Sequence, residues 1–192
     1  MTVGVLALQG GYDPHLRALA GLSGVTTILV RTVADLAAVD ALVIPGGEST
    51  TIGKLLNLQG LTSPLLKRMA EGLPVFGTCA GMILLAVEVV GREQPLLGAL
   101  DISVERNAYG RQTESFETQL SANLGGPNPQ SIPAIFIRAP RIVRLGQGVT
   151  VLAEYEGSPV LVRSANVLAA SFHPELTESS AVHRYFVSLV RT

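Results

Sequence analysis

The sequence is poor in cysteine, and this scarcity limits the chemistry that is open to it. A single cysteine, Cys79, in 192 residues excludes an intramolecular disulfide and is typical of a reducing compartment. One cysteine and three histidines are too few for a zinc cluster. We therefore predict no metal site and no cofactor, and any thiol chemistry must belong to Cys79.

Charged residues and long apolar runs are scarce as well. Only 15% of the residues are charged and the net charge is −1, which argues against nucleic-acid or anionic membrane surfaces as partners. No apolar run approaches the ~20 residues of a membrane span, and the N-terminus lacks the basic start of a signal peptide. We expect a cytoplasmic protein with a single domain over residues 1–192. The hydrophobic content of 47% indicates either a surface partly covered by a partner or a compact α/β core.

A cysteine flanked by glycines is the most informative feature that is present. Residues 77–81 read Gly-Thr-Cys-Ala-Gly, between a short apolar run and a helix-like apolar stretch. A strand, a tight turn and a helix in this order form a nucleophile elbow, here with sulfur in place of oxygen. The helix N-terminus beside Cys79 favours the thiolate. A lone cysteine is usually a small buried apolar residue, but such a residue needs no tight glycine turn around it.

Apolar runs alternate with helix-like segments through the first half of the chain. Strands are predicted at Val3–Leu8, Val25–Val30, Ala41–Ile44 and Pro74–Phe76, and helices at Asp13–Leu22, Thr50–Leu58, Pro64–Glu71 and directly after Cys79. The first of these helices is predicted to be capped by Asp13. The alternation predicts an α/β fold with an open, mainly parallel, flavodoxin-like sheet and helices on both faces.

The second half of the chain contains shorter strand-like pieces. They lie at 101–106, 115–120, 134–138, 149–155, 159–163 and 167–172, separated by Gly, Pro and Asn. They predict a small antiparallel addition, with one or two strands that return to the main sheet. A last helix over Ser179–Val190 has apolar residues at helical spacing, which we assign to the core.

A thiol nucleophile needs a base, and the base needs an orienting group. His173 follows an apolar strand, and Pro174 disfavours helical geometry at His173. In an extended chain His173 and Glu175 point to the same side, so the carboxylate can hold the imidazole in one tautomer. The pair could also be a strand-end histidine and a surface acid, but the elbow at Cys79 favours catalysis. His15 and His183 lie in amphipathic helices and are interpreted as structural, with a functional role kept open for His15.

A glycine turn and several arginines complete the candidate residues. Backbone N–H groups at Gly46 and Gly47 could form an oxyanion hole or cradle a phosphate, although no P-loop lysine follows. A simple tight turn, with Ser49 or Thr50 as helix cap, is compatible with either role. Three arginines, Arg106, Arg111 and Arg138, could clamp a substrate carboxylate or pair with a buried acid.

Together, the Gly77–Gly81 and His173–Glu175 motifs resemble those of the class-I, triad-type glutamine amidotransferases. Five further segments narrow the resemblance to the glutaminase subunits of two-component pyridoxal 5′-phosphate synthases: Leu8–Gly10, Gly46–Thr51, Arg106–Gln112, Glu114–Glu117 and Phe136–Pro140. The resemblance runs from residue 3 to about residue 186. Two stretches depart from the family pattern. Asp13-Pro14-His15 replaces an Arg-Glu-His run expected near the partner, and residues 121–133 are expected to form a longer loop than usual.

The resemblance implies a role for each candidate residue. Cys79 would be the nucleophile, His173 the general base and acid, and Glu175 the orienting carboxylate. The N–H groups of Gly47 and Ala80 would form the oxyanion hole. Glutamine would be held by six residues: Gly47, Glu48, Ser49, Arg106, Ile137 and Arg138. The reaction would be hydrolysis of L-glutamine to glutamate and ammonia through a thioester, with the ammonia delivered to a synthase subunit that makes pyridoxal 5′-phosphate.

Three alternatives stay open from the sequence. The chain could serve another ammonia-using synthase, such as one for histidine, anthranilate or guanine nucleotides. It could also be a non-catalytic α/β redox or interaction module, although the His-Pro-Glu spacing argues against this. A sensor-type cysteine hydrolase of the same fold usually has a histidine directly after the nucleophile, where this chain has Ala80.

Overall fold

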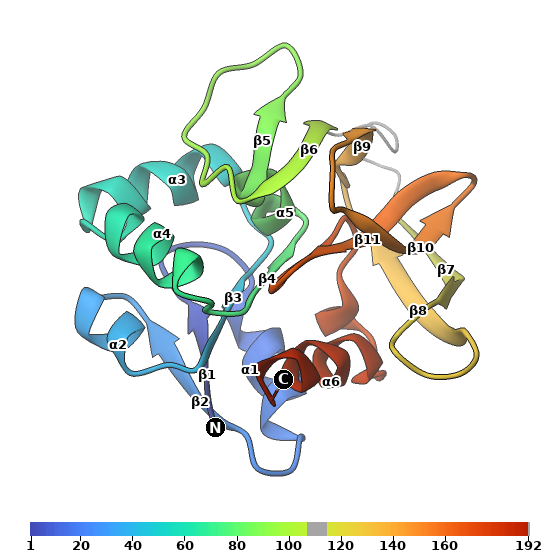
Figure 1. Cartoon of the computed structure of the whole chain (residues 1–192), viewed down its shortest axis with the longest axis horizontal. Helices are drawn as coiled ribbons and strands as arrows, with labels where there is room; N and C mark the ends of the chain where they lie inside the picture. The colour runs from blue at the N-terminus through green and yellow to red at the C-terminus, as the bar shows by residue number, and fades with distance from the viewer. Residues whose placement is uncertain (107–114, 192) are drawn as a thin grey trace.

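The computed structural model describes residues 1–106 and 115–191 and shows helices packed on a long central sheet (Figure 1). The strands are β1 (Thr2–Leu6), β2 (Thr26–Val30), β3 (Ala41–Ile44), β4 (Val75–Thr78), β5 (Ala86–Val89), β6 (Leu100–Glu105), β7 (Phe116–Ala122), β8 (Gln130–Phe136), β9 (Arg141–Leu145), β10 (Thr150–Tyr155), β11 (Ser158–Ser164) and β12 (Val167–Ala170). The helices are α1 (Tyr12–Ala20), α2 (Val33–Ala37), α3 (Ser49–Leu58), α4 (Thr62–Ala70), α5 (Ala80–Leu85) and α6 (Ala181–Ser188), with 3₁₀ turns at Pro174–Leu176 and Leu189–Arg191. No helix within these described ranges is long and apolar enough to cross a membrane.

The central sheet has a parallel part and an antiparallel part. Strands β2, β1, β3, β4 and β12 are neighbours in that order and run parallel, which is the order of a flavodoxin-like sheet. The sheet continues through β11, β10, β7 and β8 with antiparallel pairing. The predicted α/β class with a mainly parallel core is therefore confirmed. The antiparallel portion is larger than expected, because it supplies four strands of the nine-stranded sheet.

The parallel strands bury both faces. On β3, Leu42 and Ile44 join a core that includes residues of α3, α4 and α5, whereas Val43 joins a second core with Leu19 of α1 and Phe186 of α6. Each of these side chains is fully buried. Burying one such side chain stabilises the fold by about 1.5–3 kcal/mol, so the helices are held on both faces, as predicted.

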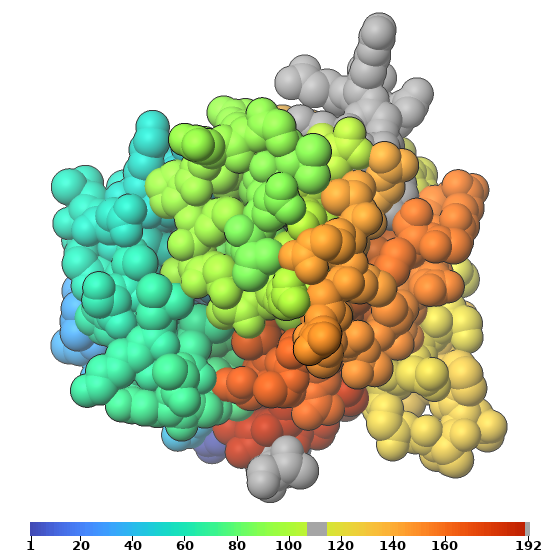
Figure 2. Space-filling model, turned by 45° about the horizontal axis from the view of Figure 1, so that its top comes forward, coloured from blue at the N-terminus to red at the C-terminus, as the bar shows by residue number. Residues whose placement is uncertain are grey.

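A separate three-stranded sheet, β5-β6-β9, lies beside the main one. Figure 2 shows the green segment of β5 and β6 against the orange segment of β9 on one face of the molecule. Ile102 and Ile142 from this sheet are buried in the same core as Leu84 of α5. The small sheet thus packs on the helix that follows Cys79.

Several local expectations were wrong. The helix predicted after Cys79 is present as α5 and is not among them; it ends at Leu85, and the chain turns into β5, where Val87 and Val89 favour extended backbone. Asp13 lies in the first turn of α1 and does not cap it, since the capping position is Gly11. The stretch 121–133 is no long loop, because β7 and β8 form a hairpin joined only by residues 123–129.

Candidate active site

The backbone at Cys79 has the strained geometry of a nucleophile elbow. Cys79 sits between β4 and α5 with φ 49° and ψ −102°, a left-handed φ that L-residues rarely adopt. A Cβ added to Gly77 would lie 2.6 Å from the backbone of Gly81, and one added to Gly81 would collide with the carbonyl oxygen of Ile44. Both glycines are therefore required by close packing around the turn. The N–H of Cys79 donates to the carbonyl of Ala170 at 2.8 Å, which fixes the turn against β12.

Sheet order brings His173 to the same place. Strand β12 pairs in parallel with β4, and the last pair in register is Ala170 with Thr78. Since both strands end there, Cys79 and His173 emerge side by side at the carboxyl edge of the sheet. The N–H of His173 donates to the carbonyl of Ile135 on β8 at 2.8 Å.

The three predicted catalytic residues lie together. Nδ1 of His173 lies 2.7 Å from Oε1 of Glu175, and a Cβ added to Gly46 would be close to both the His173 ring and Cβ of Cys79. The side chain of Glu175 is 2% exposed and that of His173 is 12% exposed. The thiol of Cys79 also points toward the carbonyl oxygen of Ile137, with a sulfur–oxygen distance of 3.9 Å.

The electrostatics around His173 and Glu175 favour a charged imidazole beside a carboxylate. Burial disfavours the charged form of His173, but hydrogen bonds and charges of Cys79 and Glu175 outweigh it and raise the pKa of His173 to about 10. Burial likewise disfavours the carboxylate of Glu175. The hydrogen bond to His173 and the charge of His173 outweigh that burial and lower the pKa of Glu175. The site can therefore store a proton on His173 next to the sulfur.

The three groups open into a cavity of about 390 Å³. Gly46 forms its floor, since a Cβ added there would lie 2.5 Å from Cε1 of His173 and 3.5 Å from Cβ of Cys79. Every residue proposed for catalysis, glutamine binding or the oxyanion hole lines this one cavity: Cys79, His173, Glu175, Gly47, Glu48, Ser49, Arg106, Ile137, Arg138 and Ala80. The other residues of the arginine segment, 107–112, and Glu114 lie outside the described residues.

Over residues 5–192 the chain matches the SNO glutamine amidotransferase family. The chain belongs to this family. A protein of Pseudothermotoga lettingae is 54% identical over 191 residues, covering 98% of this chain and 95% of that protein. One of Pelotomaculum thermopropionicum is 55% identical over 187 residues, covering 97% and 94% respectively. Both relatives carry the name pyridoxal 5′-phosphate synthase subunit PdxT.

Solved structures agree with this family assignment. A crystal structure of a glutamine amidotransferase matches with a TM-score of 0.92 at 53% identity, and covers 99% of both chains. The structure of PurLQS from Thermotoga maritima matches with a TM-score of 0.71 at 16% identity, covering 97% of each chain, and at that identity it shows the shared fold alone. The resemblance predicted from the sequence motifs is thus confirmed at the level of the family.

An ion pair lies at the mouth of the amidotransferase cavity. Nη2 of Arg106 is 2.8 Å from Oε1 of Glu48, whose side chain is 44% exposed. Glu48 also caps α3, because Oε2 accepts from the N–H of Thr51 at 2.8 Å. The predicted caps, Ser49 and Thr50, are wrong. Partial burial opposes the charge on Glu48, but the hydrogen bonds from Thr51 and Arg106 outweigh it and lower its pKa to about 2.

Two glutamines were not anticipated as parts of this site. Oε1 of Gln9 accepts from the N–H of Glu48 at 2.9 Å and packs over Gly47. Oε1 of Gln94 accepts from Arg106 at 3.1 Å, and its amide donates to Ser49 at 3.1 Å. The position of Gln9 at the end of β1, before Gly10, was a usable signal. Nothing in the sequence around Gln94 marks it.

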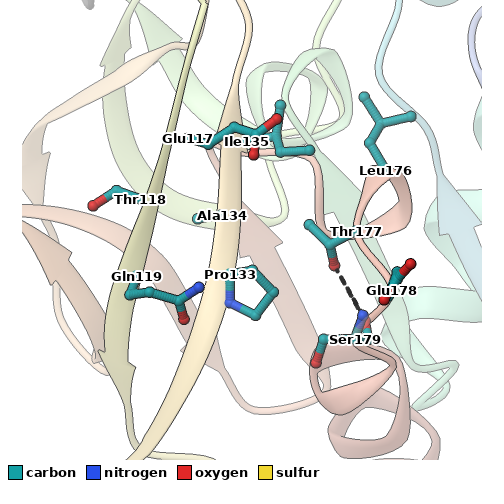
Figure 3. Close-up of a pocket in the computed structure, with 10 residues that line it drawn as sticks. All are labelled: Glu117, Thr118, Gln119, Pro133, Ala134, Ile135, Leu176, Thr177, Glu178 and Ser179. Carbon is teal, nitrogen blue, oxygen red and sulfur yellow. Dashed lines mark hydrogen bonds between the residues drawn. The ribbon is translucent and has the colours of Figure 1, made fainter.

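A larger hollow of about 780 Å³ adjoins the site, but its described lining residues include no candidate nucleophile or imidazole base (Figure 3). Its walls come from β7, β8 and the segment from Leu176 to Ser179, and Leu176 lines both hollows. None of the described residues that line it is a cysteine, a histidine or an arginine. The reactive site is therefore identified by its side chains and not by volume.

Proposed function

We propose that this chain, as one glutaminase domain over residues 1–192, hydrolyses L-glutamine and supplies ammonia to a synthase that makes pyridoxal 5′-phosphate. The observation that carries the proposal is the meeting of Cys79, His173 and Glu175 at the ends of two adjacent strands, in one cavity. Relatives that match over nearly their whole length carry the name of a pyridoxal 5′-phosphate synthase subunit, which supports this choice of product.

The geometry supports a two-step acyl transfer. The Cys79 thiolate attacks the carboxamide carbon of glutamine, and the carbonyl oxygen becomes an oxyanion that accepts from the N–H groups of Gly47 and Ala80. His173 then gives its proton to the leaving nitrogen, the carbon–nitrogen bond breaks, and ammonia departs from a thioester on Cys79. Water attacks the thioester while His173 accepts its proton. Glutamate leaves and the thiolate–imidazolium pair is restored. Glu175 holds the imidazole in place throughout.

Charge complementarity supports the proposed substrate pose. Free glutamine carries an α-carboxylate and an α-ammonium group, and the cavity offers both matching signs. Arg106 and Arg138 can attract the carboxylate, while Glu48 stays ionised because of its low pKa and can attract the ammonium. We propose that Ser49 and the backbone of Ile137 complete the contacts with glutamine.

A synthase partner follows from the chemistry of the product. In neutral water ammonia takes up a proton and is no longer a nucleophile. The ammonia must therefore reach the enzyme that uses it without contact with bulk water. We propose that the mouth of the cavity, which includes the exposed Gly47 and Arg138, faces the synthase subunit. Pro14, in the segment that departs from the family pattern, also lines this cavity.

The test is reconstitution with the synthase subunit of a pyridoxal 5′-phosphate synthase. The mixture contains glutamine, a pentose phosphate and a triose phosphate, and both glutamate and pyridoxal phosphate are measured. We expect both products with the wild-type chain and neither with Cys79→Ala. Added ammonium salt should restore pyridoxal phosphate, but not glutamate, in the variant. If the synthase works with ammonium salt but never with glutamine and this chain, the proposal is wrong, and acceptor subunits for histidine, anthranilate and guanine nucleotides become the next candidates.

A further inference from the structure

The catalytic carboxylate has a second, fully buried neighbour that the mechanism above does not use. His15 on α1 is 0% exposed, and its Nε2 lies 3.5 Å from Oε1 of Glu175. The same Nε2 is 3.1 Å from Oγ1 of Thr78, the residue directly before Cys79. His15 therefore contacts both Glu175, the orienting carboxylate, and Thr78, the residue that precedes the nucleophile. Its Nδ1 lies 3.0 Å from Nε2 of His183 on α6, which is also 0% exposed.

Aromatic packing holds both imidazole rings in place. Phe76 of β4 meets His15 edge to face, with ring centres 6.3 Å apart and an interplanar angle of 86°. It meets His183 in the same way, at 5.9 Å and 80°. Phe76 itself is fully buried. The rings cannot turn freely, so the hydrogen bond between them keeps one geometry.

Both imidazoles are neutral, so each carries its proton on only one of its two ring nitrogens. Burial lowers the pKa of His15 to about 4, despite the charge of Glu175, and burial lowers the pKa of His183 to about 3. A neutral imidazole carries one N–H and one acceptor nitrogen. Two arrangements of this pair are possible, since the shared hydrogen bond can run from His183 to His15 or in reverse.

The surroundings select one of the two arrangements. Nδ1 of His183 is buried and has no hydrogen-bond partner among the residues that the structure describes. In the reverse arrangement that nitrogen would carry an unpaired buried N–H, and the lone pair of His15 Nε2 would face the carboxylate of Glu175. In the forward arrangement His183 donates to His15, and the N–H on Nε2 of His15 faces Thr78 and Glu175. Unpaired buried donors and lone pairs that face an anion are both costly, so the forward arrangement is favoured.

We propose that His15 is a positioning residue of the glutaminase reaction, set in its Nε2–H tautomer by His183 so that one N–H anchors both Glu175 and the threonine that precedes Cys79. The inference rests on the proposed function, because a fixed Glu175 matters only if His173 exchanges protons with substrate. Loss of the N–H would let the carboxylate and the elbow shift relative to each other. Such a shift slows the chemical steps without removing any group that holds glutamine.

The first test reads the tautomers directly. A wild-type sample labelled with ¹⁵N at histidine contains only three histidines, and His15→Gln and His183→Gln assign their signals. We expect the proton on Nε2 in both His15 and His183. A proton on Nδ1 of His15 would overturn the proposal. This measurement uses the unmodified chain and needs no activity.

The second test separates positioning from mere folding support. We expect His15→Leu to lower kcat by about tenfold, with KM within about twofold of wild type, because it removes the N–H that bonds Thr78 and faces the charged Glu175. His15→Gln, whose amide N–H can reach the Nε2 position, should recover most of the loss. Leu19→Ala is the matched control, since Leu19 lies fully buried on the same helix outside this hydrogen-bonded group.

The outcomes are distinct. The proposal is overturned if His15→Leu keeps the wild-type kcat, if His15→Gln is no better than His15→Leu, or if Leu19→Ala lowers kcat as much at equal loss of thermal stability. Should His15→Leu fail to fold, the tautomer measurement and the kcat of His15→Gln still test the proposal: a proton on Nδ1 of His15, or an about tenfold loss of kcat in His15→Gln, overturns it. If wild type releases no glutamate from glutamine, with or without the synthase, the proposed function fails, and the proposal of a positioning role fails with it even where the tautomers are as expected.

Discussion

Two acids line the cavity, and their surroundings differ sharply. The side chain of Glu175 is 2% exposed and hydrogen-bonded to His173, whereas the side chain of Glu48 is 44% exposed and paired with Arg106 at the cavity mouth. A buried acid keeps one geometry because no water can replace its partner. A half-exposed acid can exchange its partner for a charged group of a substrate. The comparison teaches that burial separates an acid suited to orienting a catalytic group from one suited to binding.

The largest effect is expected at His173, the hydrogen-bond partner of the buried Glu175. His173→Asn removes the group that carries the proton between sulfur, nitrogen and water. We expect kcat to fall by about 10³–10⁴-fold, as for loss of a general acid and base, with little change in the binding of glutamine. Glutamate release in the presence of the synthase measures kcat, and calorimetry with glutamine measures binding. A loss below tenfold would remove His173 from the mechanism.

Glu175→Gln should have the next largest effect. The amide keeps the size of the side chain but no longer stabilises a charged imidazole, and its NH₂ can favour the wrong tautomer of His173. We expect kcat to fall by about 10²-fold with KM nearly unchanged. Steady-state kinetics of glutamate release give both constants. The comparison breaks down if the main effect is on KM, because Glu175 would then act in binding.

In the ion pair of Arg106 and Glu48 at the cavity mouth, Arg106→Gln should change KM more than kcat. A charge-assisted contact to the substrate carboxylate is lost, so KM should rise by about tenfold or more while kcat stays within about threefold. Arg144→Gln is the control, because Arg144 forms an ion pair of similar length with Asp101 outside the cavity, with a side chain that is 46% exposed against 20% for Arg106. Equal KM values for the two variants would mean that Arg106 is only a surface ion-pair residue.

The smallest effect concerns stability and pH. The pKa of Glu48 is lowered to about 2 in the fold, from an ordinary value of 4.5, so the unfolded chain takes up a proton here first. The stabilisation is therefore present above about pH 4.5 and is lost as the pH falls toward 2. Because the side chain is 44% exposed, we expect it to contribute less than about 1 kcal/mol. Urea unfolding of wild type and Glu48→Gln should differ at pH 7, and the difference should shrink below pH 4.5 and vanish as the pH falls to about 2. A gap that stays constant with pH would argue against the pairing.

Local patterns in the sequence were sufficient for much of the site. The glycines around Cys79 predict the tight turn, and the spacing of His173 and Glu175 predicts their hydrogen bond. Both features depend only on neighbours within a few residues. The same holds for the missed helix α2, whose capping box between Thr32 and Asp35 was readable from the sequence.

Contacts between distant segments could not be predicted in this way. The pairing of β12 with β4, which brings His173 to Cys79, depends on the path of the whole chain. The contact between His15 and His183 joins positions 168 residues apart, and both were interpreted as structural residues of their own helices, with a functional role kept open for His15 alone. Gln94 reaches Arg106 from a segment with no regular structure. The sequence alone therefore missed the polar groups that support the reactive ones.

Cys79 is proposed to be a nucleophile that faces a glutamine site, and covalent labelling tests this directly. A glutamine analogue with an electrophilic group on the side chain is incubated with the chain, and the modified residue is located by peptide mass spectrometry. We predict one modification, at Cys79, that is suppressed by an excess of glutamine and greatly slowed in His173→Asn. Labelling that glutamine does not suppress, or that falls on residues outside the cavity, would contradict the account.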